Sequence, residues 1–256
     1  MSNLPFCLRN TQSALVVGAG HGIGLGLVKH INELAPEVSI WSTYRSYDHA
    51  QDLLTLAELN PNIKALCVDP SQEDSLSQLC QNISESSKGL DLLINTVGVL
   101  HDEQVKPEKS MKYCSMDNLL HYFKVNACIA PLLAKVFMNL LKASQCSVFA
   151  SISAKVGSIG DNQLGGWYGY RASKAALNMF IKTIALEFVG RRMSTMAFAI
   201  HPGTTYTQLS EPYIARTKLK VHSAEESARN IMAVLEGKSL DDTGTFWSWD
   251  GSQIQW

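Results

Sequence analysis

The sequence contains no Cys-x-x-Cys motif, and this lack argues against a cysteine-ligated zinc site. The six cysteines are scattered along the chain, at positions 7, 67, 80, 114, 128 and 146. Such spacing favours reduced core or surface thiols over a disulfide framework. We therefore expect neither a metal site nor disulfide bonds.

The chain also lacks net charge and long hydrophobic runs. Its 22 Lys and Arg residues and 23 Asp and Glu residues leave a formal charge of −1, so charge gives no reason to expect nucleic acid or an anionic membrane as partner. No apolar stretch reaches the roughly 18 residues that span a bilayer. Residues 1–6 lack the charged and then apolar layout of a signal peptide. These absences predict a cytoplasmic protein without membrane or nucleic-acid partners.

What the chain does have is a regular alternation of strand-like and helix-like segments over 256 residues. Apolar runs predict strands at 13–17, 38–43, 63–68, 91–95, 146–151, 195–200 and 244–248, and the clearest helices between them are 117–142 and 168–189. This alternation predicts an α/β fold, a doubly wound parallel sheet of about seven strands with helices on both faces. Since α/β folds of roughly 250 residues commonly form one unit, we expect residues 1–256 to form a single domain.

Tyr170 and Lys174 lie four residues apart in the second of these helices and so share one face. A free tyrosine, with a pKa of about 10, is a poor acid or base near neutrality, but a neighbouring cation lowers that pKa. The pair is therefore a candidate for proton transfer. Taken alone it is weak, because Tyr and Lys at this spacing occur by chance on many amphipathic helices.

A glycine cluster follows the first predicted strand and opens the first predicted helix. Glycines stand at 18, 20, 22 and 24, whereas an ordinary strand-to-helix turn needs only one. Glycines at 18, 22 and 24 let the backbone turn tightly and approach a phosphate, and the free amides of the helix N-terminus attract that phosphate. The spacing departs from Gly-x-Gly-x-x-Gly, because three residues separate the first two of these key glycines and one separates the last two.

Together, Gly18-x-x-x-Gly22-x-Gly24 and Tyr170-x-x-x-Lys174 resemble the motifs of the short-chain dehydrogenase/reductase family. Three further segments resemble family motifs in the expected order. They are Asn95 to Gly98, in which Thr96 and Val97 depart from the family's Asn-Asn-Ala-Gly, then Asn126, and then Pro202, Gly203 and Thr207. The stretch 157–168 further resembles the branch that includes C-factor and sniffer-type carbonyl reductases.

This resemblance implies a Rossmann-like domain that binds NAD(P). Its expected cofactor contacts are the glycine loop with Gly18, His21, Gly22, Ile23 and Gly24, the strand ends with Asp69, Asn95 and Gly98, and the nicotinamide segment with Pro202, Gly203 and Thr207. Asp69 would hold the adenine ring, although a strand-end aspartate is equally a turn residue. Residues 203–221 are a candidate substrate lid by the same analogy, and otherwise a surface loop.

The end of the second predicted strand bears on which nicotinamide cofactor is used. NAD-binding proteins usually place an acid there for the ribose 2′-hydroxyl, whereas a 2′-phosphate needs a cation. The segment here is Thr43-Tyr44-Arg45-Ser46, with no acid before Asp48, and Arg45 can grip a phosphate with two hydrogen bonds. His21 stands where NADP-preferring relatives often carry a basic residue. We expect NADP rather than NAD, unless Arg45 is a solvated loop residue.

The resemblance also implies a mechanism of hydride transfer to or from a small carbonyl or alcohol substrate. Tyr170 would exchange the proton on the substrate oxygen, Lys174 would lower the pKa of Tyr170 and hold the ribose, and Asn126 would position a water. The family's catalytic serine is missing, since Ala154 occupies its place. Ser153 is our candidate substitute, with Ser158 less favoured. The remaining alternative is that both serines are structural and that Tyr170 alone or a backbone amide stabilises the oxyanion.

A second function also fits the sequence. Because Ala154 departs from the family and the chain resembles C-factor, it could be a cofactor-binding signalling or sensing protein with little turnover. The presence of Tyr170, Lys174 and Asn126 favours the enzyme. The resemblance further implies a homodimer or homotetramer formed through helices 117–142 and 168–189, where the apolar candidates are Leu132, Leu133, Val136, Phe137 and Leu140. The same apolar faces would serve if the helices only met the sheet.

Overall fold

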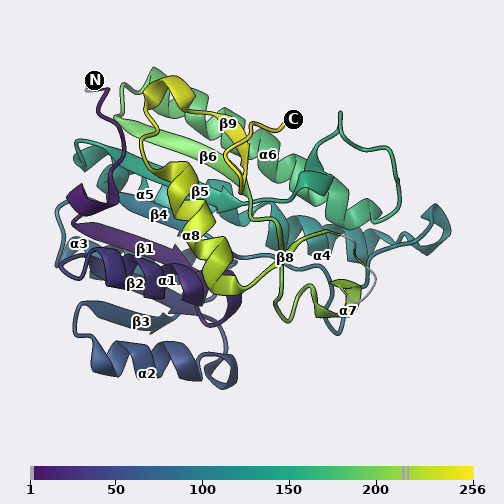
Figure 1. Ribbon diagram of the computed structural model, residues 1–256, viewed down its shortest axis with the longest axis horizontal. Coiled ribbons are helices and arrows are strands. Elements are labelled where there is room, and N and C mark those ends of the chain that lie inside the picture. The colour runs from purple at the N-terminus through teal and green to yellow at the C-terminus, as the bar shows by residue number, and fades with distance from the viewer. Residues whose placement is uncertain (1–2, 215–216, 218) are drawn as a thin grey trace.

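The computed structural model, which describes residues 3–214, 217 and 219–256, places seven parallel strands in one sheet with helices on both faces (Figure 1). The strand order is β3-β2-β1-β4-β5-β6-β9. The strands are β1 (Ser13–Val17), β2 (Ser39–Tyr44), β3 (Ile63–Cys67), β4 (Leu92–Asn95), β5 (Ser147–Ile152), β6 (Thr195–His201) and β9 (Thr245–Ser248). The predicted doubly wound fold is confirmed, and each predicted strand lies within one residue of an observed one at either end.

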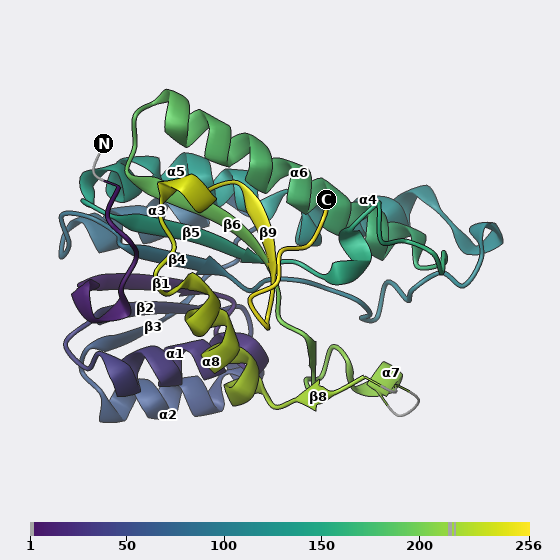
Figure 2. The same cartoon turned by 45° about the horizontal axis from the view of Figure 1, so that its top comes forward.

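Two helical layers sandwich the sheet. Figure 2 shows α3 (Glu73–Ser84), α5 (Ile129–Ala143) and α6 (Tyr168–Gly190) above it, and α1 (Gly22–Leu34), α2 (Gln51–Leu59) and α8 (Ala224–Leu235) below. The last long helix, α4 (Met116–Asn126), packs against α6.

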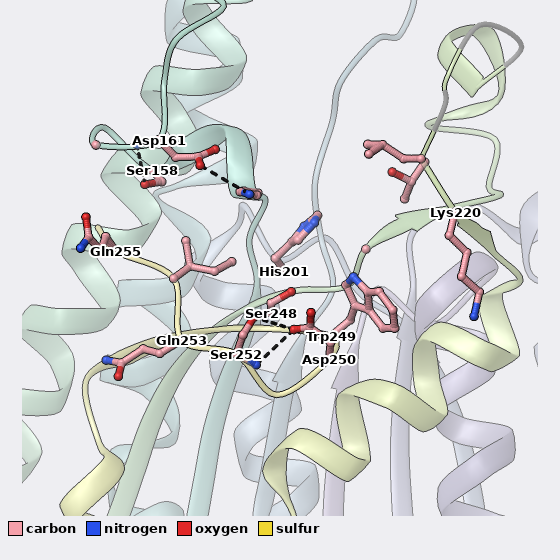
Figure 3. A pocket seen from close by; sticks show the side chains of 16 residues that line it. Ser158, Asp161, His201, Lys220, Ser248, Trp249, Asp250, Ser252, Gln253 and Gln255 are labelled. Atoms are coloured by element: carbon pink, nitrogen blue, oxygen red, sulfur yellow. Dashed lines mark hydrogen bonds and ion pairs between the residues drawn. The ribbon is translucent and has the colours of Figure 1, made fainter.

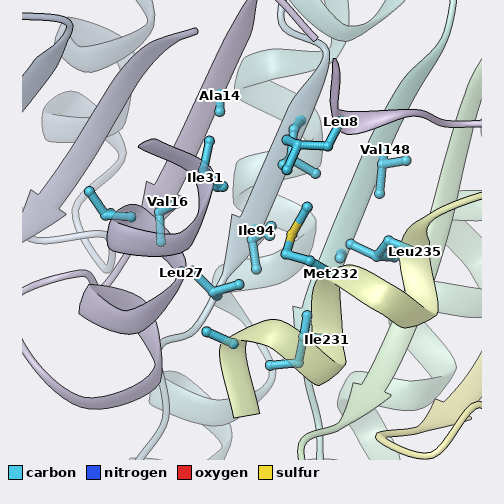
Figure 4. Packing of buried hydrophobic residues seen from close by; sticks show 14 of the residues in the cluster. Leu8, Ala14, Val16, Leu27, Ile31, Ile94, Val148, Ile231, Met232 and Leu235 are labelled. Carbon is cyan, nitrogen blue, oxygen red and sulfur yellow. The ribbon is translucent and has the colours of Figure 1, made fainter. Parts of the chain in front are cut away.

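Alternate residues of each strand feed the two layers, because successive side chains of a strand point to opposite faces. Ala14 and Val16 of β1 join the core between the sheet and helices α1 and α8 (Figure 4). Leu15 and Val17 join the core between the sheet and helices α3, α5 and α6. Both faces of the sheet are therefore buried, as expected for an all-parallel sheet.

The predicted helix 117–142 is wrong in one respect, because the chain forms two helices, α4 and α5, separated at Ala127 and Cys128. Pro131 explains the break. It lacks an amide hydrogen and its ring would collide with the carbonyl of residue 127 in a continuous helix, so it is tolerated only in the first turn of a new one.

The apolar residues proposed for an oligomer interface on α5 pack inside the same chain instead. Leu133, Phe137 and Leu140 are buried in the core between α5 and the sheet, and Leu132 and Val136 are partly buried against it. Exposed apolar side chains lie on α6, where Met179 is 66% and Leu186 61% exposed. Leu132 and Val136 keep part of their surface exposed, so of the expected residues these two stay available to an interface through the helices.

Residues 116–143, which span α4 and α5, are long and apolar enough to cross a membrane by length and composition alone. Half of the most apolar window is buried inside the protein, where α5 lies against the sheet. The core helix of a globular α/β protein has the same composition.

The segment predicted as a lid carries short elements of its own. β7 (Thr204–Thr205) pairs with β8 (Val221–His222), and α7 (Glu211–Ile214) lies between them, away from the main sheet in Figure 2. Residues 215, 216 and 218 of the predicted lid lie outside the described residues.

Candidate active site

A cavity of about 550 Å³ lies at the carboxyl ends of the central strands, where the strand order changes direction between β1 and β4. Val17 pairs with Asn95 across these two strands, so the segments that follow them emerge side by side. Ligands of doubly wound sheets bind at this switch point. The cavity is lined by most of the predicted site residues: Gly18, His21, Gly22, Ile23, Gly24, Gly98, Ser153, Tyr170, Lys174, Pro202, Gly203 and Thr207.

The glycine loop has the geometry of an anion cradle. Gly18 has a φ of +87°, a conformation that L side chains rarely adopt, and a Cβ at Gly24 would collide with the carbonyl oxygen of Gly18. Helix α1 begins directly after this turn, and its N-cap residue His21 makes no side-chain capping hydrogen bond. Its first amides therefore face the cavity side of the loop as donors for an anionic group.

Tyr170 and Lys174 are both buried on α6, with exposed fractions of 8% and 4%. Lys174 Nζ lies 6.0 Å from the Tyr170 ring centroid and donates a hydrogen bond of 2.9 Å to the carbonyl oxygen of Ile152 at the end of β5. Burial raises the pKa of Tyr170 to about 12, which is opposite to the predicted lowering by Lys174, and it lowers the pKa of Lys174 to about 8. Near neutrality the phenol thus holds its proton, while the lysine is charged but close to losing its proton.

Asn126 ends α4 and ties two parts of the site together. Its Oδ1 accepts from the Val99 amide at 2.7 Å, and its Nδ2 donates to the Val99 carbonyl at 2.9 Å and to Ser173 Oγ at 3.0 Å. Ser173 Oγ in turn donates to the Tyr170 carbonyl oxygen at 2.9 Å. The asparagine therefore connects the segment after β4 with the helix that carries Tyr170.

The serines near Ala154 are both engaged within the protein. Ser153 Oγ donates a 2.6 Å hydrogen bond to Asn178 Oδ1, and Ser158 Oγ accepts from the Asp161 amide at 3.3 Å. Ser153 follows the last residue of β5, so strand alternation does not fix its direction. Its single proton is directed at Asn178, and a hydrogen bond to a substrate oxygen would require it to leave that partner. A catalytic role for Ser153 stays a prediction, and the engaged hydroxyl favours the alternative that both serines are structural.

Three other predicted residues lie at strand ends outside the cavity lining. Asn95 Oδ1 accepts from the Val97 amide at 3.1 Å and shapes the turn after β4. Asp69 Oδ1 accepts from the Ser71 amide at 2.9 Å. Burial acts to raise the pKa of Asp69, but hydrogen bonds from Ser71 and the charge of Arg45 outweigh it and lower that pKa. Arg45 and Asp69 thus face a common region beyond β2 and β3.

Some residues at or near the cavity had no individual role assigned from the sequence. Trp167 has a φ of +53°, follows two glycines of positive φ, and its ring centroid lies 5.5 Å from that of Tyr213 on α7 and 6.1 Å from that of Tyr170. The buried Glu108 accepts the amide hydrogens of Trp167, through its carbonyl at 2.6 Å, and of Gly169, through Oε2 at 3.1 Å. A loop distant in sequence therefore holds the start of α6, the helix that carries Tyr170.

A second cavity of about 480 Å³ adjoins the first and is lined by the end of the chain (Figure 3). His201, Asp161 and Gly203 border both cavities. Burial, helped by the charge of Lys155, lowers the pKa of His201 to about 4, and its buried Nδ1 has no hydrogen-bond partner among the described residues. A neutral imidazole thus lies at the junction. Within residues 3–214, 217 and 219–256, no three His, Cys, Asp or Glu side chains cluster as metal ligands do.

Comparison with known proteins identifies the family of this chain. Residues 12–218 match the short chain dehydrogenase family. The chain belongs to that family. It is therefore an NAD(P)-dependent oxidoreductase that acts on carbonyl or alcohol groups, as predicted. The glycine loop and the Tyr170-Lys174 helix of this short-chain dehydrogenase both lie within the matched residues.

Carbonyl reductases are prominent among the similar structures. The NADPH-bound carbonyl reductase from chicken fatty liver is 27% identical with a TM-score of 0.87, covering 96% of this chain and 94% of its own. The carbonyl reductase Sniffer of D. melanogaster is also 27% identical, with a TM-score of 0.85, covering 96% of this chain and all of its own. A curated relative, 1-hydroxy-2-glutathionyl-2-methyl-3-butene dehydrogenase of Rhodococcus, is 26% identical and covers 96% of this chain and 100% of its own. The predicted resemblance to the sniffer-type branch is confirmed.

Proposed function

We propose that this short-chain dehydrogenase is an NADP-dependent reductase of small carbonyl compounds, or equally a dehydrogenase of the corresponding alcohols, with Tyr170 as general acid and base. The observation that carries the proposal is the buried Tyr170-Lys174 pair on the wall of the same cavity that the glycine loop lines. Reduction of a carbonyl by hydride transfer requires a proton donor for the oxygen and a site that holds the phosphates of the cofactor, and here both face one cavity.

The protonation states support this assignment. With its pKa raised to about 12, the Tyr170 phenol is protonated near neutrality and can donate to a carbonyl oxygen that becomes negative. The charged Lys174 beside it stabilises the phenolate that remains. When bound, the nicotinamide cofactor supplies or accepts the hydride.

Asn126 has the capacity for its proposed role in the proton path. Both Nδ2 hydrogens are used by Val99 and Ser173, and Oδ1 accepts one hydrogen bond from Val99. An amide oxygen accepts two, so one position stays open for a water near Lys174. Gly98 keeps that space small, since a Cβ there would lie 3.3 Å from Lys174 Nζ and 3.4 Å from Asn126 Oδ1.

NADP is favoured over NAD by the residues around the glycine loop. Arg45 follows β2, His21 lies in the loop, and no carboxylate stands between β2 and Asp48. In this proposal the adenine end lies near Asp69, the amides of Gly22 to Gly24 hold the pyrophosphate, and the nicotinamide end reaches Gly98, Pro202, Gly203 and Thr207. The similar chicken carbonyl reductase was solved with NADPH bound.

The experiment is NADPH oxidation with a panel of aldehydes, ketones and quinones, comparing the wild type with Tyr170→Phe. Tyr168→Phe is the matched control, because Tyr168 lies two residues earlier on α6, is 40% exposed and lies outside the cavity lining. We expect turnover with at least one panel member, its loss in Tyr170→Phe, and no change in Tyr168→Phe. Tight NADPH binding without turnover on any member would contradict the enzyme and favour a sensing protein.

We further propose that residues 203–221 act as a substrate lid and that the protein associates through α4, α5 and α6. Leu209, Tyr213 and Ile214 of the lid segment line the cavity. The exposed Met179 and Leu186, seven residues apart, lie on one face of α6. Light scattering of a Met179→Glu, Leu186→Glu variant tests the association, with a lower molar mass than the wild type as the expected result.

A further inference from the structure

Two histidines from different segments meet beside the glycine loop. His21 is the N-cap residue of α1, and His49 ends a short 3-10 helix (Tyr47–His49) after β2. Their ring centroids lie 6.2 Å apart with the ring planes 77° apart. His21 lines the cavity at the glycine loop, where the cofactor's phosphates are proposed to bind, and the exposed His49 lies beside it outside that lining.

Close backbone packing brings the two histidines together. A Cβ at Gly20 would lie 3.3 Å from the Cβ of Tyr44 and 3.4 Å from the carbonyl oxygen of His49, so the glycine loop rests directly on residues 44–49. Helix α2 begins just beyond, at Gln51, after an N-cap alanine that has no capping side chain. The amides of that helix start add to the positive potential at this corner.

The charged surroundings favour an anion between these segments. Burial and the neighbouring His49 both lower the pKa of His21. Arg45 supplies a permanent positive charge at the end of β2, partly offset by Asp69 on the side of β3, and Asp48 is the acid within the 3-10 helix itself. Without an anion, His21 resists protonation because it is partly buried and because a positive charge on His49 would repel its own. A bound dianion removes that penalty.

We propose that His21 and His49 form a proton-dependent clamp for the 2′-phosphate of NADP, so that the preference for NADP over NAD weakens as pH rises through neutrality. This inference rests on the proposed NADP-dependent function and extends it with a second phosphate-binding histidine, His49, and a pH response. A phosphate monoester is largely a dianion above its second pKa of about 6. Two imidazoles that each take up a proton when the phosphate binds would supply two positive charges to this dianion.

The direction in which NADP affinity changes with pH follows from the number of protons that the free and bound proteins carry. If the phosphate raises the pKa of both imidazoles, the NADP complex carries more protons than the free protein, so affinity for NADP falls as pH rises. NAD has a hydroxyl at the same position and takes up no proton through these residues. Arg45 is charged at all accessible pH values, so its contribution to NADP affinity does not change.

The test is the dissociation constant of NADPH and of NADH, measured by fluorescence titration at about pH 6.5 and about pH 8.5. We expect the ratio of the NADH to the NADPH constant to be at least about fivefold larger at the lower pH. Calorimetry in buffers of different ionisation enthalpy is expected to show proton uptake with NADPH and none with NADH. Neither measurement needs a carbonyl substrate.

Three variants test which residues cause the pH response of this ratio. His49→Gln is expected to reduce the change in ratio to less than about twofold, and His21→Arg to keep the ratio high at both pH values. His30→Gln is the control, because His30 lies on α1 outside this corner and is expected to leave the pH response unchanged. His49 is exposed, so its substitution does not disturb the core.

The possible failures are distinguishable. If neither cofactor binds, the proposed function fails and this inference fails with it. If both bind but the ratio is the same at both pH values, or if His49→Gln responds as the wild type does, the proposed function stands and the histidine clamp is overturned. A pair of histidines that only pack against each other would give that second result.

Discussion

The two sides of the cavity, the Tyr170 side on α6 and the serine side after β5, treat their polar groups differently. Tyr170 and Lys174 are buried and border the space where a substrate would lie. Burial raises the pKa of Tyr170, which keeps its proton available for donation, and lowers the pKa of Lys174 toward neutrality. On the other side, the hydroxyls of Ser153 and Ser158 are held by Asn178 and Asp161, and Ala154 lines the cavity with a methyl group. The difference supports the proposal that Tyr170 is the proton donor and that neither serine replaces the family's usual one.

The largest effect that tests this contrast is expected from Lys174→Met. Losing the buried charge beside the phenol is expected to lower kcat/KM for carbonyl reduction about 100-fold, or ~2.7 kcal/mol of transition-state stabilisation. Lys182→Met, on the same helix and remote from the cavity, is the control. A loss of less than about threefold for Lys174→Met would mean that the tyrosine works without its cation.

The pH dependence of kcat/KM tests the Tyr170 side of the cavity further. A lysine is charged below its pKa, and that of Lys174 is lowered to about 8, so its support for the phenolate is present near neutrality and lost as pH rises through about 8. The kcat/KM for reduction is expected to fall over that range. Lys174→Arg, which keeps its charge, is expected to move the fall to higher pH. A wild-type profile flat to about pH 10 would contradict the assignment.

Ala154→Ser tests the other side by returning a hydroxyl to the family's position. Because Ala154 lines the cavity, the new hydroxyl is expected to reach the substrate oxygen and raise kcat/KM by more than about threefold. Ala172→Ser, at an exposed position of α6, should leave activity unchanged. An unchanged or lower kcat/KM in Ala154→Ser would show that the substrate oxygen lies elsewhere.

Glu108→Ala tests what holds the Tyr170 side in place. Without the carboxylate, the buried Gly169 amide loses its partner, and we expect a loss of about 1–3 kcal/mol in the free energy of unfolding. Glu103→Ala, an exposed residue of the same loop, should change stability by less than about 0.5 kcal/mol. Equal stability of the two variants in denaturant unfolding would remove Glu108 as the anchor of α6.

The glycine loop and the Tyr170-Lys174 pair were predictable because their geometry is local. A run of glycines at a strand end and two residues four apart on a helix have the same arrangement in any such fold. The break between α4 and α5 was also visible in the sequence, as Pro131, but the apolar periodicity on either side concealed it. Alternating apolar runs were enough to predict all seven strands of the sheet.

Contacts between distant segments were not predictable. Glu108 lies in a polar run typical of a solvated loop, yet it is buried because that loop folds over the start of α6, 61 residues later in the chain. Trp167 adopts a left-handed backbone that sequence patterns assign to glycine. The partner of Ser153, Asn178, comes from the interior of α6, so only the packed structure shows that its hydroxyl is already engaged.

The most direct test of the account is a side-by-side measurement of kcat/KM for Tyr170→Phe and Ser153→Ala with the same carbonyl substrate and NADPH. We expect a loss of about 10²–10⁴-fold for Tyr170→Phe, the size of a general acid's contribution, and a change within about twofold for Ser153→Ala. Losses of similar size in the two variants would contradict it and restore Ser153 as the second catalytic donor.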